Sequence, residues 1–456
     1  MKIIIVGLGD TGLRLVQDFA RERKHQIVVI DTDGTKISEV IGSSSDVNGI
    51  VGNGCFAPIL EDAGANGADL IIAVTERDEL NILCCLVAES LGTKYSIAQV
   101  HNAEYYAHYD SMGGHLGVNL FVNQEAVVAD EIFRILKAPK GVKLATFGKK
   151  KLEMAEFTID KDSKLVGKSL MQVRNTKKKD FLFVSVSRGE EVIMPNGSTV
   201  LEEGDVINVC AKHQELPKVL DYFSIGNDTV RSVIILGSTE TAYSLAKNLL
   251  ENNVRVKLIS SDEKACQKLN ERLEELTVVC DDCFDEEVLI REGIAFADAL
   301  VVMTPSDEKN VLVSLYAQRY KLRKLVTVVR SGLYQSVLKE NASNVVVSPY
   351  SIVVENIAMH GRWVNVPKDS QILSLRRLAH DRVEALEFNV GKNPAFVGKS
   401  VAQLSGSIRP GLLFCAIIRN GRVPIIPHGD TVIEAGDNII VASIDQRLKQ
   451  LEDILK

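Results

Sequence analysis

The first part of the chain alternates short apolar runs with amphipathic stretches of helical length. Runs typical of buried strands occupy residues 2–6, 26–30, 69–74, 95–100 and 119–123. Segments with helical spacing of apolar residues lie between them, for example 12–22 and 79–91. Strands that alternate with helices form a parallel sheet covered on both faces, because each connection must cross over the sheet. The pattern therefore predicts a Rossmann-like, doubly wound α/β domain.

A different pattern follows beyond residue 141. Short strand-like runs such as 181–187 and 205–211 are separated by turn sequences, including Pro195-Asn196-Gly197 and Glu203-Gly204-Asp205. This pattern predicts a small mixed α+β domain after the first one.

Both patterns recur later in the chain. Cys55-Phe56 and Ala68-Asp69 match Cys283-Phe284 and Ala297-Asp298, with an offset of 228–229 residues. LVGKSL (165–170) matches FVGKSV (396–401), and IMPNGSTVLEEGDVINV (193–209) matches IIPHGDTVIEAGDNIIV (425–441), with an offset of 231–232 residues. Because two unlike segments recur in the same order at nearly the same offset, the chain is a tandem duplication of a two-part unit.

The duplication predicts four domains. They are a Rossmann nucleotide-binding domain at 1–140, a small domain at 141–226, a second Rossmann domain at 230–366 and a second small domain at 370–456.

Composition narrows the class of protein. The 456 residues carry a formal net charge of −7 and are 46% hydrophobic, which is typical of a globular chain and unlike a nucleic-acid-binding protein. No apolar run approaches the ~18–20 residues that span a bilayer, and the segment from Met1 to Val6 does not resemble a signal peptide. Eight cysteines are too few for a disulfide scaffold. We therefore expect a soluble, cytoplasmic protein.

The first strand leads into a glycine-rich loop. Gly7-Leu8-Gly9-Asp10-Thr11-Gly12 fits G-x-G-x-x-G, and Asp31 ends the next strand 19 residues beyond Gly12. In such loops the first glycine permits the turn, the second lets a pyrophosphate approach the backbone, and the third lets the helix pack on the strand. A pyrophosphate would lie on the helix N-terminus, and Asp31 would accept hydrogen bonds from ribose hydroxyls. The alternative is a glycine turn that only packs.

Two acids in this region bear on the choice of ligand. A carboxylate at Asp31 disfavours the 2′-phosphate of NADP(H), so NAD(H) or an adenosine nucleotide is preferred. The carboxylate of Asp10, inside the loop, repels a triphosphate and mildly favours a dinucleotide over ATP.

The second half lacks much of this fingerprint. Its loop keeps Gly237, but Thr239 stands at the middle glycine position and Ser260 replaces the strand-end acid. Because the side chain of Thr239 would crowd a pyrophosphate, we expect the second Rossmann domain to be degenerate.

A further motif persists where the fingerprint does not. Thr75, Asp78 and Asn81 match Thr304, Asp307 and Asn310. One interpretation places Thr75 and Glu76 against the ribose or phosphate, and the other makes Thr75 or Asp78 a helix N-cap. Persistence without the glycines favours capping for Asp78, whereas Thr75 could serve in both ways.

Other motifs carry little chemistry. Cys280 and Cys283 form a single C-x-x-C, and the carboxylates between them disfavour a reactive thiolate. The stretch that contains His101, His108, Asp110 and His115 is more typical of a solvated helix than of a metal site. No acid–base pair suited to a dehydrogenase is evident, so we expect neither catalytic residues nor a metal site.

Together the motifs resemble the regulator of conductance of potassium (RCK) family. The resemblance rests on GLGDTG (7–12) with Asp31, and on LVGKSL (165–170) and PNGSTVLEEGD (195–205). It covers essentially the whole chain. Two such units in one chain are similar to the cytosolic regulatory subunits of Trk-type potassium uptake systems.

The resemblance implies a regulatory protein that binds NAD(H), or alternatively ATP or ADP. Its nucleotide contacts would be Gly7, Leu8, Gly9, Asp10, Thr11, Gly12, Asp31, Thr75, Glu76 and Gln99. It also implies a dimer or tetramer that forms a ring on the cytoplasmic face of the membrane and gates a potassium-translocating subunit resembling TrkH, with no nucleic-acid partner.

The resemblance also extends to two helical segments. The segments near 125–137 and 351–362 look like the family's crossover and dimer-contact helices, although their apolar faces would equally fit an intramolecular core.

An alternative function for the whole chain is that of an NAD-dependent oxidoreductase with a duplicated Rossmann core.

Overall fold

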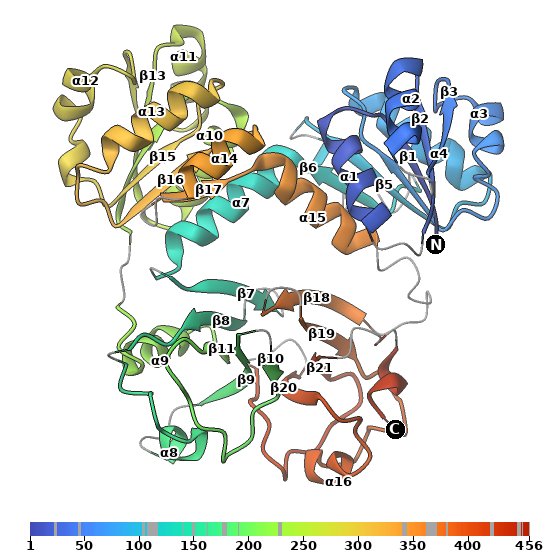
Figure 1. Ribbon diagram of the computed structural model, residues 1–456, viewed down its shortest axis with the longest axis vertical. Helices are drawn as coiled ribbons and strands as arrows, with labels where there is room; N and C mark the ends of the chain where they lie inside the picture. Colours follow the sequence, from blue (N-terminus) through green and yellow to red (C-terminus); the bar gives the residue numbers. More distant parts are fainter. Residues whose placement is uncertain are drawn as a thin grey trace. The chain divides into compact units, whose positions relative to one another are not determined.

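In the residues that it describes, the computed structural model contains four β-sheets, and Figure 1 labels most of their strands. It describes residues 1–21, 25–43, 47–102, 105–106, 117–139, 141–147, 151–161, 163–175, 180–189, 191–226, 230–339, 344–361, 372–379, 382–419, 424–444, 448 and 450–455. Contacts group the chain into two units, Met1–Leu136 with Val230–Asn365, and Lys137–Thr229 with Val366–Lys456. None of the helices described in these ranges is long and apolar enough to cross a membrane.

The first sheet is parallel and has the strand order β3-β2-β1-β4-β5-β6. This order, with a switch point between β1 and β4, is that of a doubly wound dinucleotide-binding fold, so the predicted fold class is confirmed. Its elements are β1 (Lys2–Val6), α1 (Asp10–Arg21), β2 (Gln26–Asp31), α2 (Gly34–Ser43), β3 (Val47–Val51), α3 (Ala57–Asp62), β4 (Leu70–Ala73), α4 (Asp78–Ser90), β5 (Tyr95–Val100) and β6 (Leu120–Asn123).

One strand of this sheet was missing from the prediction. Strand β3 has the sequence VNGIV and lies at the edge of the sheet, where most of its side chains are partly or fully exposed. Asn48 and Gly49 interrupt its apolar pattern, and glycine weakens a strand pattern because it has no side chain to pack.

The second sheet repeats the first with the order β14-β13-β12-β15-β16-β17. Its elements are β12 (Ser232–Leu236), α10 (Glu240–Glu251), β13 (Arg255–Ser260), α11 (Glu263–Arg272), β14 (Thr277–Cys280), α12 (Glu286–Arg291), η1 (Ile294–Phe296), β15 (Ala299–Val302), α13 (Asp307–Ala317), β16 (Lys324–Val328), α14 (Gly332–Lys339) and β17 (Asn344–Val347).

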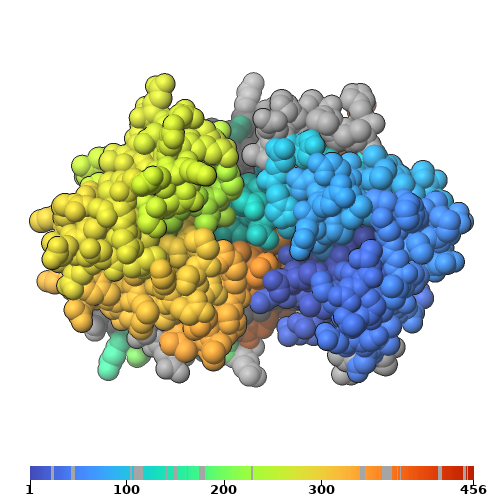
Figure 2. Space-filling view, turned by 90° about the horizontal axis from the view of Figure 1, so that it is seen from above, coloured from blue at the N-terminus to red at the C-terminus, as the bar shows by residue number. Residues whose placement is uncertain are grey.

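Helices α7 (Gln124–Lys137) and α15 (Pro349–Gly361) each follow the last strand of one Rossmann sheet and pack against the other Rossmann half. Helix α15 packs on α1, and a Cβ on Gly361 would lie 2.8 Å from Leu70 Cδ2. Helix α7 contacts the second half, since Asn248 donates to Asp130 Oδ1 at 2.8 Å. The apolar face of α7 lies in one core shared by both sheets. In Figure 2, α7 (teal) and α15 (orange) lie where the blue and yellow regions meet.

The small domains form antiparallel sheets that share a core of their own. The sheet orders are β10-β9-β11-β8-β7 and β18-β19-β21-β20. Met154 and Cys210 belong to the same apolar cluster as Cys415 and Ile440. The elements are β7 (Lys143–Phe147), β8 (Leu152–Thr158), α8 (Leu170–Asn175), β9 (Phe181–Arg188), β10 (Glu191–Ile193), β11 (Val206–Lys212), α9 (Leu216–Tyr222), β18 (Ile372–Leu378), β19 (Val383–Asn389), α16 (Val401–Ser405), β20 (Leu412–Ile418), β21 (Asn438–Ser443) and η3 (Leu451–Ile454).

A buried ion pair explains why the turn before β11 recurs. Arg188 donates from Nε and Nη2 to the two carboxylate oxygens of Asp205 at 2.8 and 2.9 Å. Arg419 and Asp437 make the same two bonds at 2.9 Å in the second half. Burial by itself would raise the pKa of Asp205, but the hydrogen bond and charge of Arg188 outweigh it and lower that pKa.

We predict that Asp205→Ala lowers the free energy of unfolding by about 2–4 kcal/mol, because it leaves Arg188 without its buried partner. Urea denaturation measures this change, and Glu203→Ala, at an exposed position of the same turn, serves as the control with a change near zero.

The same pair makes stability depend on pH. A carboxyl whose pKa is lowered by folding contributes stability above its unfolded pKa of about 3.9, and loses it as pH falls through the folded pKa. The stability difference between the native protein and Asp205→Asn should therefore stay constant from pH 7 to 5 and shrink below about pH 4. A difference that grows on acidification would contradict the assignment.

Candidate functional site

The glycine-rich loop lies between β1 and α1, at the carboxyl edge of the first sheet. Gly7 has φ of +97°, and its N–H donates to the Ile30 carbonyl oxygen at 2.9 Å. A Cβ at Gly7 would lie 3.0 Å from the Thr75 nitrogen, and one at Gly12 would lie 1.9 Å from the Gly7 oxygen. These two glycines are therefore required by the fold itself, because the turn and the helix leave no room for a side chain.

Gly9 differs from the other two glycines. Among the described residues, apart from its two neighbours in the chain, no atom lies within 4 Å of the position that its Cβ would take, and Gly9 is exposed. Gly9 precedes the first residue of α1 and has no side chain to accept hydrogen bonds from the first turn of the helix. An open space in front of a helix N-terminus without a side-chain cap suits a phosphate group.

Asp31 holds this loop in place. Leu8 N–H donates to Asp31 Oδ2 at 2.6 Å, and Asp33 N–H donates to Oδ1 at 2.9 Å. The carboxylate is half-buried, so it supports the loop while it keeps access to solvent. Leu8 and Thr11 are themselves buried, and of the loop residues Gly9 and Asp10 are the exposed ones.

The corresponding loop of the second half satisfies its own backbone. Thr239 is the N-cap of α10, and its hydroxyl accepts the Ala242 N–H at 3.2 Å. Ser238 Oγ lies 2.9 Å from Ser260 Oγ, at the position where the first half has Asp31. The helix N–H that a phosphate would contact is thus already bonded, which agrees with the predicted degeneracy.

Thr75 and Asn81 form a hydrogen-bond network that joins the ends of β4 and β5. Thr75 donates from its N–H and its hydroxyl to Asn81 Oδ1 at 2.8 and 2.6 Å. Asn81 Nδ2 donates to the carbonyl oxygens of Thr75 and Gln99 at 3.0 and 2.9 Å. Asn81 is fully buried, and Thr304 and Asn310 repeat the arrangement. The motif therefore persists because it holds β4 and β5 together, with or without a nucleotide.

The prediction that Asp78 caps its own helix is wrong. The N-cap of α4 is Arg77, and it makes no side-chain cap hydrogen bond. Asp78 instead accepts the N–H groups of His101 at 2.9 Å and Asn102 at 2.8 Å, just beyond β5. Asp307 accepts two N–H groups in the same way in the second half. The carboxylate joins two strand ends that are distant in sequence, which a local capping pattern does not reveal.

Gln99 and Glu76 lie on the β4–β5 side of the glycine loop. Gln99 is 4% exposed, and its Oε1 is buried with no hydrogen-bond partner among the described residues. An orphaned buried acceptor of this kind is typical of a ligand site, since an unpaired polar atom in the interior is costly. Glu76 is exposed, so its carboxylate is accessible to a ligand.

The second half contributes side chains that sequence reasoning missed. Arg14 of α1 lies over the Tyr350 ring at 5.4 Å and donates from Nη2 to the Arg330 carbonyl oxygen at 3.4 Å. Burial and a hydrogen bond to Asp10 raise the pKa of Tyr350. Tyr350 therefore lies close to Asp10, an acid of the first glycine-rich loop, although the two residues lie 340 positions apart in sequence.

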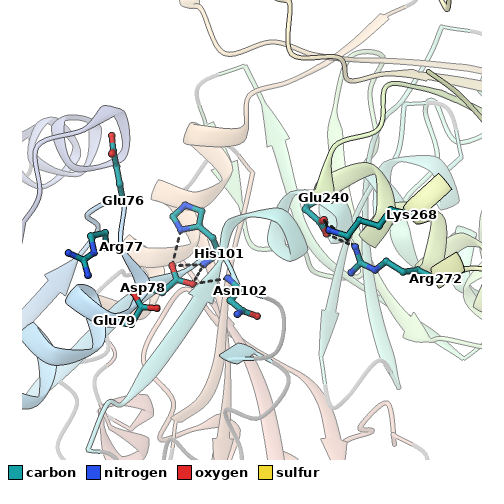
Figure 3. A pocket seen from close by; sticks show the side chains of 9 residues that line it. All are labelled: Glu76, Arg77, Asp78, Glu79, His101, Asn102, Glu240, Lys268 and Arg272. Atoms are coloured by element: carbon teal, nitrogen blue, oxygen red, sulfur yellow. Dashed lines mark hydrogen bonds and ion pairs between the residues drawn. The ribbon is translucent and has the colours of Figure 1, made fainter. Parts of the chain in front are cut away.

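A cavity of about 850 Å³ opens between the two Rossmann halves (Figure 3). Charged and polar residues of both halves line it: Glu76, Arg77, Asp78, Glu79, His101, Asn102, Glu240, Lys268 and Arg272. Asp78 and His101 are paired on one wall, with 3.0 Å between Oδ1 and Nδ1, and Glu240 is paired with Arg272 on the other.

The remaining motifs form no comparable site. Cys283 is buried, and burial together with the charge of Asp282 raises its pKa to about 11, so its thiol is unreactive at neutral pH. His108, Asp110 and His115 lie outside the described residues. In the described ranges, no three His, Cys, Asp or Glu side chains are arranged to hold a metal ion.

Comparison with known sequences agrees with the duplication. The family model of the TrkA-N domain matches residues 3–123 and 233–349, and that of the TrkA-C domain matches 154–224 and 385–456. A Trk system potassium uptake protein TrkA homolog of Archaeoglobus fulgidus is 30% identical over 456 residues and covers all of both chains. A Trk system potassium uptake protein TrkA of Vibrio alginolyticus is 28% identical over 451 residues, 98% of this chain and 96% of its own.

Solved structures share the fold. The GsuK channel bound to NAD superimposes with a TM-score of 0.63 at 20% identity, over 97% of this chain and 76% of that one. The GsuK RCK domain gives a TM-score of 0.61 at 19% identity, over 97% and 92% of the two chains. The predicted resemblance to RCK units is confirmed. Since both domain types match twice and the relatives have nearly the same length, the chain belongs to the TrkA family of potassium uptake proteins.

Proposed function

We propose that this protein is the nucleotide-binding regulatory subunit of a Trk-type potassium uptake system, and that it gates a membrane subunit resembling TrkH. The observation that carries the proposal is the contrast between the two loops. Gly9 leaves an open helix N-terminus in the first half, whereas Thr239 closes the equivalent one in the second. A duplicated chain with a single binding site is suited to sensing a ligand, because a change that the ligand causes in the first half can be transmitted through the second half.

The nucleotide would bind across the carboxyl edge of the first sheet. The pyrophosphate lies over Gly9, with the backbone from Gly7 to Gly12 around it. Asp31 accepts the ribose hydroxyls, and Thr75, Glu76 and Gln99 face the ligand beyond β4 and β5. NAD(H) fits this arrangement, with ATP or ADP as further ligands. GsuK, which shares the fold, has been solved with NAD bound.

The contact of Tyr350 with Asp10 offers a route from the site to the second half. A phosphate that arrives over Gly9 brings negative charge next to the Asp10 carboxylate, which lies close to Tyr350. The ligand then favours one arrangement of α15 over another, because its free energy of binding differs between the two. A ring of such subunits, peripheral on the cytoplasmic face of the membrane, would pass that difference to the ion path.

An NAD-dependent oxidoreductase is the second candidate. The His101–Asp78 pair at the end of β5 is the observation that favours it, since such a pair can exchange protons with a substrate. The test is to incubate the purified protein with NAD(H) and small carbonyl or hydroxyl substrates. Turnover of the nicotinamide would decide in favour of an oxidoreductase.

We predict that Gly9→Val abolishes NADH binding without unfolding the protein. The new side chain enters open space in the free protein but occupies the place of the pyrophosphate, so the affinity should fall at least about 100-fold, or ~2.8 kcal/mol. Titration calorimetry should find one NADH per chain in the native protein and none in the variant. The matched change Thr239→Val should leave NADH binding intact and cost about 1 kcal/mol of stability through the lost cap.

We also predict that Asp31→Ala weakens NADH binding by about 1–3 kcal/mol, since it removes a charged ribose contact. Circular dichroism should accompany the calorimetry, because Asp31 also holds Leu8. Ser260→Ala, at the equivalent position of the second half, should leave the affinity unchanged. An Asp31→Ala protein that is folded and binds NADH normally would place the ribose elsewhere.

Potassium flux tests the regulation itself. When the native protein and its membrane partner are reconstituted in liposomes, we expect nucleotide to change the flux, and we expect Gly9→Val to bind the partner but lose this response. Flux that ignores the nucleotide in the presence of the native protein would refute the regulatory proposal.

A further inference from the structure

We infer that Cys55 and Cys84 are a modification site, at which a peroxide joins the two thiols in a reversible disulfide and thereby weakens nucleotide binding. The covalent step rests on the geometry of the two cysteines alone. Its effect on affinity rests on the proposed nucleotide site in the first half, so the disulfide and the affinity are measured separately.

The two sulfur atoms are in contact while both thiols are free. Cys55 Sγ lies 3.5 Å from Cys84 Sγ, and either thiol can donate a hydrogen bond to the other. Because a disulfide holds its sulfur atoms about 2.0 Å apart, the pair must approach by only about 1.5 Å. Cys55 is half-buried and Cys84 is fully buried, so a small oxidant in solution reaches Cys55 first.

The oxidation consumes one molecule of hydrogen peroxide for each disulfide. The thiolate of Cys55 attacks a peroxide oxygen, the O–O bond breaks, and the leaving hydroxide combines with the proton that Cys55 released, so that a sulfenic acid and water result. The sulfur of Cys84 then attacks that of Cys55, the S–O bond breaks, and the leaving hydroxide takes the Cys84 proton as water. The two thiols lose two electrons, and the peroxide gains them.

The order of the two steps follows from the surroundings of Cys84. Burial, and then the neighbouring Cys55 thiol, raises the pKa of Cys84. Cys84 therefore stays protonated and does not react with the oxidant directly, but it is in place to attack the sulfenic acid of Cys55.

The second half has no equivalent pair. Cys283 stands at the position equivalent to Cys55, but Val313 stands at the position equivalent to Cys84. A valine cannot complete a disulfide, so the pair belongs to the half whose glycine-rich loop has an uncapped helix.

A different pair of thiols lies in the second half and serves as a control. Burial, followed by a hydrogen bond to Cys280, raises the pKa of Cys266 to about 11. Cys266 lies in α11 and Cys280 ends β14, in the half where Thr239 caps the helix after the loop. Oxidation of these two cysteines should therefore leave nucleotide binding unchanged.

The segment that carries Cys55 borders the proposed nucleotide site. It connects β3 with α3, and the N–H of Gly52 donates to the Asp31 carbonyl oxygen at 2.9 Å. The Asp31 carboxylate in turn holds the glycine-rich loop. A Cβ on Gly54 would lie 3.3 Å from Cys84 Sγ, so the backbone of this segment packs directly on the second thiol. A shift of the segment is thus passed to the ribose-binding acid.

The disulfide should move this segment and not helix α4. Asn81, in the first turn of α4, is fully buried and is bonded to Thr75 and to the Gln99 carbonyl oxygen. This network fixes the position of Cys84 in the helix, so the approach of the sulfur atoms must be taken up by the segment at Cys55. The nucleotide site is then drawn away from the geometry that it has with free thiols.

The first measurement locates the disulfide in the full-length protein. After treatment with hydrogen peroxide, peptide mass mapping without reduction should find a link between the peptides of Cys55 and Cys84, which dithiothreitol removes. Cys55→Ser and Cys84→Ser should each abolish this link. Cys85→Ser, at the next position of the helix, should leave it intact, because the Cys85 thiol donates instead to the Ile97 carbonyl oxygen.

The second measurement reads the effect on the ligand. Once the peroxide has been removed, calorimetry should find NADH affinity lowered by about fivefold to tenfold in the oxidised native protein, and dithiothreitol should restore it. Peroxide should not change the affinity of Cys55→Ser or Cys84→Ser, whereas Cys280→Ser should respond as the native protein does.

Three outcomes would overturn the inference. Peroxide treatment that leaves Cys55 and Cys84 unlinked would refute the covalent step. A complete link with unchanged NADH affinity would refute its effect on binding. A response that persists in Cys55→Ser and disappears in Cys280→Ser would assign it to the pair in the second half. If the reduced native protein bound no NADH, the proposed nucleotide site would be wrong, and the peptide map would still decide the covalent step.

Discussion

The exchange of helices α7 and α15 is the constraint on which the rest of the structure depends. Each helix leaves its own sheet and buries an apolar face against the other Rossmann half, so that two sheets share one core. Separating the halves would expose this surface to water at roughly 25 cal/mol per Å². The two halves are therefore held together by one apolar core. Every contact between them, including Tyr350 on Asp10 and the wall at Arg272, follows from this packing.

The glycine-rich loop of the first half and its counterpart in the second half have the same backbone turn, but they differ in whether the following helix is capped. Gly9 leaves its helix N-terminus open, and Thr239 closes the equivalent one with its own hydroxyl. The glycines that shape the turn, Gly7 and Gly237, have positive φ in both halves, so the backbone turn is the same although the middle residue differs. One side chain at the middle position of the loop is enough to cap the helix in the second half and to leave it uncapped by that residue in the first.

Much of the fold and the position of the glycine-rich loop could be predicted from local sequence patterns. Apolar runs identified the doubly wound sheet, matching segments identified the duplication, and glycine spacing identified the loop from Gly7 to Gly12. The prediction for Asp78 was wrong because its carboxylate bonds to N–H groups 23 and 24 residues away, not to its own helix. The role of Asn81 could not be seen for the same reason. Strand β3 was missed because an edge strand with Gly49 lacks a clear apolar pattern.

The sequence by itself determined most of the strands, that they occur twice, and which half has glycine at the middle position of the loop. These properties depend on neighbours within a few residues, and periodicity reports them directly. Only the tertiary structure decided that Tyr350 stands against Asp10, that Asn81 ties β4 to β5, and that Arg272 faces the edge of the first sheet. A hydrophobic pattern shows that one face of an element is buried. It does not show which other element that face packs against, because any apolar surface can cover it equally well.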